Sequence, residues 1–330
     1  MKISIAMATY NGAAHLREQL ASFAAQTHLP DELVVTDDRS TDDTLDILRD
    51  FAETAPFDVR IEANPQNLGF AQNFNRALSL CTGDLVFLSD QDDVWKETKI
   101  AYMATLAAKT PGALCLMNDA LMADGNLVPS GQSKLAEIRA SGLPDSAFVM
   151  GCCAVLRREL LEFSLPIPAL MRAHDNWLVG ICDQVGRVTR VNEPLQYYRL
   201  HGGNTSDFFI NRPRQLGWGE RQLDRVQRAL ARITSTSGFE GEYRFYASFA
   251  ERLKHHPDFC ETTVAQKVAA RLAVLTARWN IRTRPRLARM MPVLRLWRRA
   301  GYESKFGVLK DILLSSAPPR PDRQTDKDAE

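Results

Sequence analysis

The residues best suited to chemistry form an acidic run that follows an apolar segment. Leu85–Leu88 has the length and composition of a buried strand, and three carboxylates follow it closely, at Asp90, Asp92 and Asp93. Carboxylates this close together repel one another unless a cation or solvent relieves the charge. Acidic groups at the carboxyl end of a parallel strand commonly hold a hard divalent ion that also binds substrate phosphates. Taken alone, the run is equally consistent with an acidic surface turn.

The elements that must position this run alternate between strand and helix patterns. Apolar runs of strand length occur at Ile3–Thr9, Leu33–Thr36, Val59–Glu62, Leu85–Leu88 and Leu114–Asn118. Between them, apolar residues recur with helical spacing over Ala13–Ala25, from a cap at Ser40 or Thr41 to Phe51, over Phe70–Leu80 and over Lys96–Ala108. This alternation predicts an α/β fold with a doubly wound, mostly parallel sheet and helices on both faces.

Polar clusters follow four of the predicted strands. They are Thr9-Tyr10-Asn11-Gly12, the run that begins at Asp37, the run that begins at Asn64, and the acidic run. In a doubly wound sheet such turns converge on one crevice. The first turn lacks the Gly-x-Gly-x-x-Gly of dinucleotide-binding enzymes, and the chain has no Gly-Lys-Ser/Thr phosphate loop. An acidic crevice without a glycine-rich loop favours phosphates that are neutralised by a metal ion.

The strand and helix rhythm changes beyond Asn118. Residues 123–145 are rich in Gly, Pro, Ser and Asp, which predicts loops over the sheet edge. The further elements that we expect are a strand at Val149–Leu156, a helix at His174–Gln184, and strands at Val188–Val191 and Leu195–Leu200. Helical patterns then dominate from Arg212 to about Leu314. The predicted domains are a catalytic domain over 1–207 with halves 1–118 and 119–207, a helical basic extension over 208–316, and a disordered tail over 317–330.

Composition limits the class of protein. The 330 residues are 45% hydrophobic and 25% charged, which is typical of a soluble globular protein. No apolar run is long enough to cross a bilayer, and the first eight residues resemble a strand rather than a signal peptide. The six cysteines form no Cys-x-x-Cys pair, which predicts reduced thiols in a cytoplasmic protein without a zinc site.

One segment near the C-terminus is strongly basic. Val264–Lys310 carries twelve Lys or Arg residues and one acid, whereas the chain before it has an excess of acids. Its interleaved apolar residues are Leu272, Leu275, Trp279, Leu287, Met290, Met291, Leu294 and Trp297. Two interpretations are open. The helices lie on an anionic membrane surface, or their apolar residues pack on the catalytic domain while the arginines face water. No nucleic-acid-binding motif accompanies these charges.

Four motifs, in order and in the expected strand context, resemble those of family 2 glycosyltransferases of the GT-A fold. They are Thr9-Tyr10-Asn11, Asp37-Asp38-x-Ser40-Thr41-Asp42-x-Thr44, Asn67-x-Gly69 and Asp90-Gln91-Asp92-Asp93-Val94-Trp95. The resemblance covers about residues 1–207. Two further segments, His174-Asp175-Asn176-Trp177 and Tyr197–Asn204, look most like the rhamnosyltransferase branch that builds bacterial surface polysaccharides.

This resemblance implies an inverting, metal-dependent transfer of a sugar, with rhamnose as the best guess. The implied donor is a dTDP- or UDP-sugar, the acceptor is a saccharide or a lipid-linked saccharide, and the cofactor is Mg2+ or Mn2+. Such an enzyme works in the cytoplasm or peripherally at the inner face of the cell membrane. A sugar-phosphate nucleotidyltransferase is an alternative, although its glycine-rich first loop is missing at Ala8–Gly12. A non-catalytic interaction protein with a basic C-terminal module is another, although no expected carboxylate is missing.

Carried over position by position, the donor-binding residues of the family are Thr9, Tyr10, Asn11, Asp38, Asn67, Gly69, Asp90 and Gln91. The first two would line the base pocket, and Asp38 would accept the N3–H of uracil or thymine. Asp38 is also consistent with a charge that complements a helix N-terminus, and Asn67 and Gly69 with a plain turn. The chain departs from the family at Arg39, where glycine is usual. Its guanidinium either reaches the phosphates or points outward.

The resemblance also assigns metal, catalytic and acceptor positions. Asp92 and His201 would bind the metal, and Asp175 would be the general base that removes the acceptor proton. The remaining positions, on the acceptor side or in support of the site, are Asp93, Trp95, His174 and Trp177.

Three of these assignments have structural alternatives. Asp175 is consistent with a carboxylate that caps the helix dipole, although His174 and Trp177 beside it suggest an aromatic wall that raises its basicity. His201 is consistent with a structural histidine, and Asp93 with a solvated surface acid.

Overall fold

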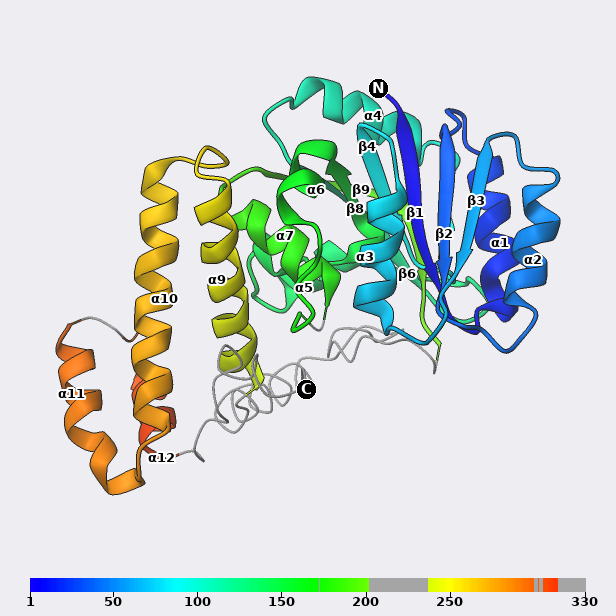
Figure 1. Cartoon of the computed structure of the whole chain (residues 1–330). Helices are drawn as coiled ribbons and strands as arrows, with labels where there is room; N and C mark the ends of the chain where they lie inside the picture. Colours follow the sequence, from blue (N-terminus) through cyan, green and yellow to red (C-terminus); the bar gives the residue numbers. More distant parts are fainter. Residues whose placement is uncertain (172, 202–236, 300–301, 303–304, 314–330) are drawn as a thin grey trace. The chain divides into compact units, whose positions relative to one another are not determined.

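A computed structural model describes residues 1–171, 173–201, 237–299, 302 and 305–313 (Figure 1). Contacts within the chain divide it into two compact units, Met1–Gln215 and Leu216–Glu330. The domain boundary predicted between 207 and 208 and the tail predicted over 317–330 lie outside the described residues.

A nine-stranded sheet forms the centre of the first unit. Its strands are β1 (Ile3–Thr9), β2 (Glu32–Asp37), β3 (Asp58–Ala63), β4 (Leu85–Ser89), β5 (Val94–Trp95), β6 (Cys115–Ala123), β7 (Pro129–Ser133), β8 (Ala154–Arg157) and β9 (Val188–Arg199). Their order is β3-β2-β1-β4-β8-β6-β9-β5, and β7 pairs with β6. Strands β1 to β4 run parallel, as do β6 and β9, and the other pairs are antiparallel. The predicted α/β class, with a mixed and largely parallel sheet, is confirmed.

Helices cover both faces of this sheet (Figure 1). Those of the first unit are α1 (Ala13–Ala24), α2 (Thr44–Ala52), α3 (Phe70–Leu80), α4 (Lys99–Lys109), α5 (Lys134–Ala140), α6 (Arg158–Ser164) and α7 (His174–Gln184). On one face Ile5 and Met7 of β1 share an apolar cluster with Leu20 of α1, to which α2 and α4 also contribute. On the other face α3 lies against the sheet, where the Asn73 carbonyl accepts a hydrogen bond from the Thr36 hydroxyl at 2.9 Å.

Strand register brings the polar turns to one edge. Thr9 at the end of β1 pairs with Asp37 at the end of β2, and Met7 pairs with Ser89 at the end of β4. Because these strands are parallel neighbours, the turns that follow them leave the sheet side by side. The sheet therefore delivers the acidic run and the first two polar clusters to a common place.

Two predicted boundaries are wrong for identifiable reasons. The helix expected from Ser40 or Thr41 begins at Thr44, because the Ser40 hydroxyl instead bonds Asp37 at 2.6 Å. The loops expected over 123–145 contain β7 and α5. Helix α5 forms because Ser133 caps it, accepting from the Ala136 N–H at 3.3 Å, while Leu135 is buried.

Two further strands differ from expectation. The strand expected at Val149–Leu156 begins with a short 3-10 helix over Gly151–Cys153, and only then becomes β8. The two strands expected over Val188–Leu200 are the single long β9, whose register against β6 shifts near Asp119. A polar interruption at Asn192 therefore marks an irregularity in pairing rather than a turn.

The second unit is helical, as predicted. Its described elements are α9 (Ser237–His255), α10 (Thr262–Arg282), a 3-10 helix (Arg286–Arg289), α11 (Met290–Arg298) and α12 (Lys305–Leu313). Helices α9 and α10 pack through an aromatic cluster that includes Phe239, Tyr243 and Trp279. Among the described helices, none is both long enough and apolar enough to cross a membrane.

A buried ionic network holds the second unit together. Asp311 of α12 is fully buried and accepts from the guanidinium groups of Arg278 at 2.8 Å and Arg282 at 2.6 Å, and from the Tyr302 hydroxyl at 2.8 Å. Arg289 donates to the backbone carbonyls of Arg284 and Arg282. A buried acid requires such partners. These arginines of the basic segment therefore serve the interior.

Candidate active site

The carboxyl ends of β1 and β2 are bound to each other through Asp37. This buried carboxylate accepts from the Thr9 hydroxyl at 2.8 Å and from the Ser40 backbone N–H and hydroxyl at 2.8 and 2.6 Å. Thr9 is itself buried, so its side chain supports the edge of the sheet instead of presenting a free hydroxyl to a ligand.

Asp38 ties the second polar cluster to the third. Its buried carboxylate accepts from the Asn64 side-chain amide at 2.9 Å and from the backbone N–H groups of Leu68 at 2.7 Å and Gly69 at 2.8 Å. A carboxylate has about four acceptor sites, and these hydrogen bonds fill three of them. Because Gly69 is the N-cap of α3, the alternative that Asp38 complements a helix N-terminus holds for α3, whereas the acid in the first turn of α2 is Asp46.

Backbone conformation explains two residues of these loops. Gly69 is the N-cap of α3 and has a φ of 79°. The Asn67 side-chain amide donates to the Asp38 carbonyl at 3.2 Å. Only glycine adopts such a φ without steric cost. Arg39 has a φ of 69°, which accounts for the glycine that is usual at this position, and its side chain is exposed.

Gln91 links the first loop to the acidic run. Its side-chain amide accepts from the Tyr10 N–H at 2.8 Å and donates to the Tyr10 carbonyl at 3.1 Å. The Tyr10 ring is left exposed, and the Asn11 side chain accepts from the Thr41 N–H at 2.8 Å. A Cβ at Gly12 would lie 2.4 Å from the Gln91 oxygen, so a larger residue there would displace the Gln91 side chain. Gln91 and Asn11 thus shape the pocket wall, and Tyr10 offers an aromatic face.

The acidic run is only partly exposed, and its charges interact. Burial, and then the charges of Asp92 and Asp175, raise the pKa of Asp90 to about 7. Asp175 comes from α7, far along the chain. The structure therefore brings the two predicted carboxylate groups, from β4 and from α7, to one site.

Asp92 lies against His201. The Nε2 atom of His201 is 2.8 Å from an Asp92 carboxylate oxygen, and both side chains are largely buried. Neighbouring ligands at right angles around an ion at about 2.0–2.1 Å are about 2.9 Å apart. In the structure this contact is a hydrogen bond, and its spacing also suits two adjacent ligands of one ion. His15 of α1 lies beside them, with its ring centroid 5.0 Å from that of His201.

Asp93 points into the protein. It is fully buried and accepts from the Gln196 amide at 2.8 Å and the Arg199 N–H at 3.3 Å. Burial, followed by the charges of Asp92 and Asp90, raises its pKa well above the ordinary value. The alternative of a solvated surface acid is therefore wrong.

Trp95 is also a core residue. Its ring packs on Phe23 at 4.7 Å between centroids and on Phe87 at 5.8 Å. It therefore cannot contact an acceptor directly, in contrast to the expectation for the acceptor side.

A buried lysine beneath the site was not expected from the sequence. Lys99 donates to the Cys152 carbonyl at 2.9 Å and to the Gln196 side-chain oxygen, and its ammonium lies 3.9 Å from the Trp95 ring centroid. Burial lowers its pKa to about 8, against the nearby negative charges of Asp93 and Asp90. The lysine therefore balances part of the acidic charge from below. The sequence around Lys99, which includes the apolar residues Ile100 and Met103, did not indicate this role.

Arg199 also supports the acidic run, a role that the sequence did not predict although the residue lies in the Tyr197–Asn204 segment. Its buried guanidinium donates to the Asp92 carbonyl at 2.8 Å and the Gly125 carbonyl at 2.7 Å, and it forms an ion pair with Glu18. It therefore holds the backbone of the acidic run.

The side chain of Cys152 also lies beside the acidic run. Its sulfur and the carboxylates of Asp90 and Asp93 lie within 4.8 Å of one another. A hydrogen bond with Cys153 and burial raise the pKa of the Cys152 thiol well above its ordinary value, so it stays protonated.

Helix α7 presents Asp175 in its first turn, with the side chain half-buried. The preceding His174 is buried and stacks on Phe74 at 3.9 Å between ring centroids. A Cβ at Gly151 would lie 2.6 Å from the His174 Nε2, so glycine permits this close approach. Trp177 is fully buried and donates to the Ser164 carbonyl at 3.0 Å. The prediction that Trp177 forms an aromatic wall beside Asp175 is therefore wrong, because its ring packs inside the protein.

Comparison with known proteins matches residues 4–164 to the family described as Glycosyl transferase family 2. The chain carries a family 2 glycosyltransferase domain. An uncharacterized glycosyltransferase of Nostoc sp. is 33% identical over 217 residues, which are 62% of this chain and 66% of that protein. The dTDP-rhamnosyl transferase RfbG of Shigella flexneri is 29% identical over 254 residues, 68% of this chain and 84% of that protein. The family and the enzyme class predicted from the sequence are confirmed.

Solved structures show the same fold at low sequence identity. TarS 1-349 of S. aureus, in complex with UDP-GlcNAc, has a TM-score of 0.54 and 18% identity, covering 92% of this chain and 93% of that chain. The mannosyltransferase PcManGT of Pyrobaculum calidifontis, in complex with GDP-Man and Mn2+, has a TM-score of 0.51 and 19% identity, covering 93% of this chain and 77% of that chain. These likenesses confirm the GT-A type fold.

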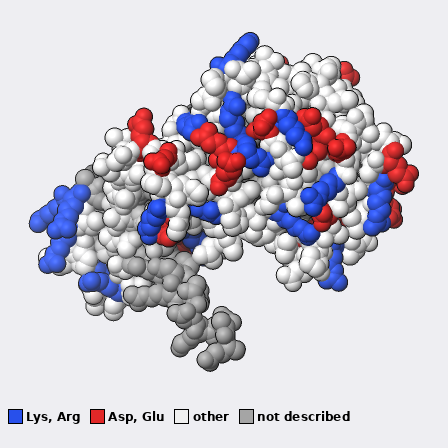
Figure 2. Space-filling model, turned by 45° about the horizontal axis from the view of Figure 1, so that its top comes forward, with Lys and Arg blue, Asp and Glu red and all other residues white. Residues whose placement is uncertain are grey.

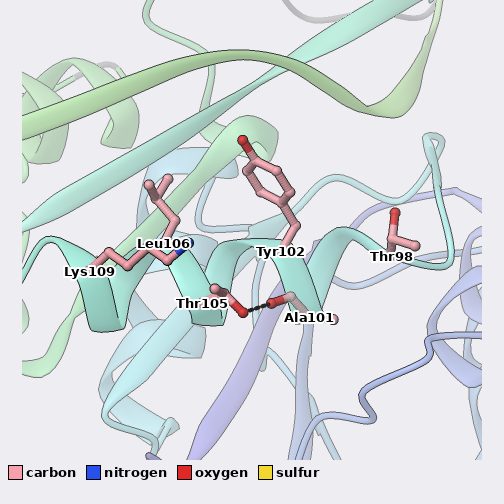
Figure 3. A pocket seen from close by; sticks show the side chains of 6 residues that line it. All are labelled: Thr98, Ala101, Tyr102, Thr105, Leu106 and Lys109. Atoms are coloured by element: carbon pink, nitrogen blue, oxygen red, sulfur yellow. Dashed lines mark hydrogen bonds between the residues drawn. The ribbon is translucent and has the colours of Figure 1, made fainter.

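A hollow of about 450 Å³ elsewhere on the glycosyltransferase unit is distinct from this site (Figure 3). Its lining residues are Thr98, Ala101, Tyr102, Thr105, Leu106 and Lys109. All belong to α4 or are its N-cap, Thr98. No carboxylate lines it, so it is not the place where the acidic run acts.

The buried His174 predicts a pH-dependent stability for this glycosyltransferase. Both ring nitrogens lack a hydrogen-bond partner among the described residues, and burial lowers the His174 pKa below its ordinary 6.5. Protonation therefore favours the unfolded chain. We expect a contribution to the free energy of unfolding that is lost as pH falls below about 6.5, by at most about 1.4 kcal/mol per pH unit, until the folded-state pKa is reached.

Urea unfolding across this pH range measures the effect. His174→Phe, which keeps a ring against Phe74, is expected to reduce the slope of stability against pH. His28→Gln, at an exposed histidine, serves as the control and should leave the slope unchanged. Equal slopes for the wild type and His174→Phe would show that His174 does not titrate in this way.

Proposed function

We propose that this enzyme transfers a sugar, with inversion, from a nucleoside-diphosphate donor to a saccharide or lipid-linked saccharide acceptor in cell-surface polysaccharide synthesis, and that it requires Mg2+ or Mn2+. One observation carries the proposal. Asp90 and Asp92 after β4 share one site with Asp175 of α7, where burial and then the charges of Asp92 and Asp175 raise the pKa of Asp90 to about 7. Acids converge in this way where a cation and a base act on one substrate.

The donor set suits a hard divalent ion. The carboxylates of Asp90 and Asp92 and the imidazole of His201 come together at the carboxyl edge of the sheet, with the buried Lys99 as a nearby cation. Asp92 and His201 would hold the ion, with Asp90 directed toward hydroxyl groups of the donor. When bound, such an ion neutralises the diphosphate of the leaving group. The Mn2+ in the PcManGT complex supports this proposal.

The donor pocket has features suited to a uracil or thymine nucleotide. The exposed Tyr10 ring offers a stacking surface, and the remaining acceptor site of Asp38 matches the N3–H that both bases carry. Asp38 therefore does not distinguish UDP from dTDP. The likeness to a dTDP-rhamnosyl transferase supports rhamnose as the sugar, and the likeness to the UDP-GlcNAc complex of TarS supports a uridine donor.

Asp175 is the proposed general base. Its carboxylate takes the proton of the acceptor hydroxyl as that oxygen attacks the anomeric carbon, and the bond to the diphosphate breaks on the opposite face. The nucleoside diphosphate leaves with the bonding electron pair. The ring of His174, which precedes Asp175 in the chain, stacks on Phe74.

The test is a screen of donors and nucleotides with either ion. Calorimetric titration of UDP, dTDP and GDP in Mg2+ measures base preference, and hydrolysis of dTDP-rhamnose, UDP-GlcNAc and GDP-mannose measures sugar preference. We expect tight binding of UDP or dTDP, weak binding of GDP, and turnover only with a divalent ion. Binding of GDP in preference to both others would contradict the role of Asp38, and no nucleotide binding at all would contradict the function.

A further inference from the structure

The second unit exposes a stripe of large apolar side chains. Leu287 is 96% exposed, Met291 61% and Trp297 48%, and Met290 and Leu294 are exposed as well. The stripe, defined as Leu287, Met290, Met291, Leu294 and Trp297, runs along the 3-10 helix and α11. Its members are three or four residues apart, so they share one face of the helix. Contiguous exposed apolar side chains of this size mark a contact surface.

The inward side of the same helical segment packs within the second unit. Val293 is fully buried, and Arg289 is buried with bonds to the carbonyls of Arg282 and Arg284. The aromatic core of the unit lies between α9 and α10, where Trp279 and Leu275 are buried. Of the apolar residues in the basic segment, those of α10 therefore pack inside, and those of the stripe face outward.

Positive charge surrounds the stripe. Arg284, Arg286, Arg295, Arg298 and Arg299 are all exposed, and residues 283–299 include no acid. Figure 2 shows a group of Lys and Arg side chains at the left-hand end of the view without Asp or Glu among them. The arrangement differs from that of Arg278, Arg282 and Arg289, whose guanidinium groups are bonded inside the unit.

We propose that residues 283–299 form a docking surface for an anionic lipid bilayer, with the stripe inserted among the lipid headgroups and the five exposed arginines on lipid phosphates. Apolar and aromatic side chains bordered by arginines are suited to the headgroup boundary, because the apolar groups leave water and the guanidinium groups keep phosphate partners. This surface is much narrower than Val264–Lys310, which the sequence suggested. The proposal does not rest on sugar transfer.

Charge argues against another copy of the chain as the occupant. Two copies that met through this face would bring two sets of five arginines together, with no acid among residues 283–299 to pair with them. An anionic bilayer supplies the opposite charge. Each basic residue near such a surface strengthens binding about fivefold.

Vesicle sedimentation tests the proposal without donor or acceptor. We expect the full chain to bind vesicles of phosphatidylcholine mixed with phosphatidylglycerol, to bind less at high salt, and not to bind pure phosphatidylcholine. Neutralising Arg295, Arg298 and Arg299 to glutamine should weaken binding about a hundredfold. The matched control is the same change at three exposed cations of the first unit, Arg17, Arg49 and Lys109, and it should have little effect.

A fluorescence measurement keeps the test independent of folding defects. Lipids with brominated acyl chains quench tryptophan that enters the bilayer, so bound wild-type protein should lose emission. Trp297→Phe keeps an apolar ring in the stripe, and it should bind while losing most of this quenching.

Several results would overturn the proposal. They are no binding to anionic vesicles at low salt, equal loss in the arginine variant and its control, and quenching that persists in Trp297→Phe. A stripe that instead covers another part of this chain would show as lower thermal stability of Leu287→Gln without lipid. A stripe that joins two copies would show as a dimer that this variant dissociates.

Discussion

Asp175→Asn is expected to reduce turnover by about a hundredfold or more while nucleotide-sugar binding stays nearly unchanged. The amide keeps the size of the side chain in the first turn of α7 but cannot take a proton from the acceptor. Its charge is one of those that raise the Asp90 pKa, so the Asp90 pKa should also fall in the variant. Initial rates with donor and acceptor, beside calorimetric donor binding, separate the two effects.

The matched control is Asp50→Asn, which makes the same change at an exposed carboxylate of α2. It should turn over like the wild type. Normal turnover of Asp175→Asn on a true acceptor would mean that another group is the base. A parallel loss of donor binding would mean that Asp175 belongs to the donor pocket.

Asp92→Ala is expected to weaken donor binding in Mg2+ or Mn2+ by about a hundredfold and to abolish turnover. Loss even of a group that only orients a metal ligand costs about ten- to a hundredfold, and Asp92 is proposed as a ligand itself. Its contact with His201 at 2.8 Å would be lost as well. Calorimetry with nucleotide and metal, together and separately, measures the change.

Chelation provides the companion experiment. Excess chelator should abolish the turnover of the wild type, and added Mg2+ or Mn2+ should restore it. In Asp92→Ala the ion should restore little, whereas Asp50→Asn should recover fully. Full wild-type activity with negligible metal content would refute the metal assignment, and unchanged donor affinity in Asp92→Ala would refute the role of that carboxylate.

Much of the site could be predicted because local pattern and topology agree. Apolar runs that end in polar clusters identify parallel strands and the edge where they end, and parallel neighbours bring those ends together. The pairing of Thr9 with Asp37, and of Asp38 with the loop at Gly69, follows from this rule. The helix that carries Asp175 was predicted with its observed bounds, His174–Gln184.

The residues that support the site could not be predicted, because their roles depend on contacts across long sequence separations. Lys99 resembles an ordinary helix-surface lysine, yet it lies beneath the acids against Gln196. Asp93 stands next to Asp92 in the chain, but it is buried against Gln196, whereas Asp92 contacts His201. Arg199 can donate to the Asp92 carbonyl only because β9 passes beside the acidic run in the folded chain.

The sequence alone determined the order of the strands' polar ends, the carboxylate chemistry at the sheet edge and the excess of arginine near the C-terminus. These properties depend on residue type and on short-range periodicity, which a sequence displays directly. Only the tertiary structure decided the direction in which each group faces. In the second unit Trp279 and Arg282 are buried, whereas Trp297 and Arg298 are exposed, although both pairs belong to the same basic segment. The difference arises because α9 and the buried Asp311 cover α10, and no described element covers the outer face of α11.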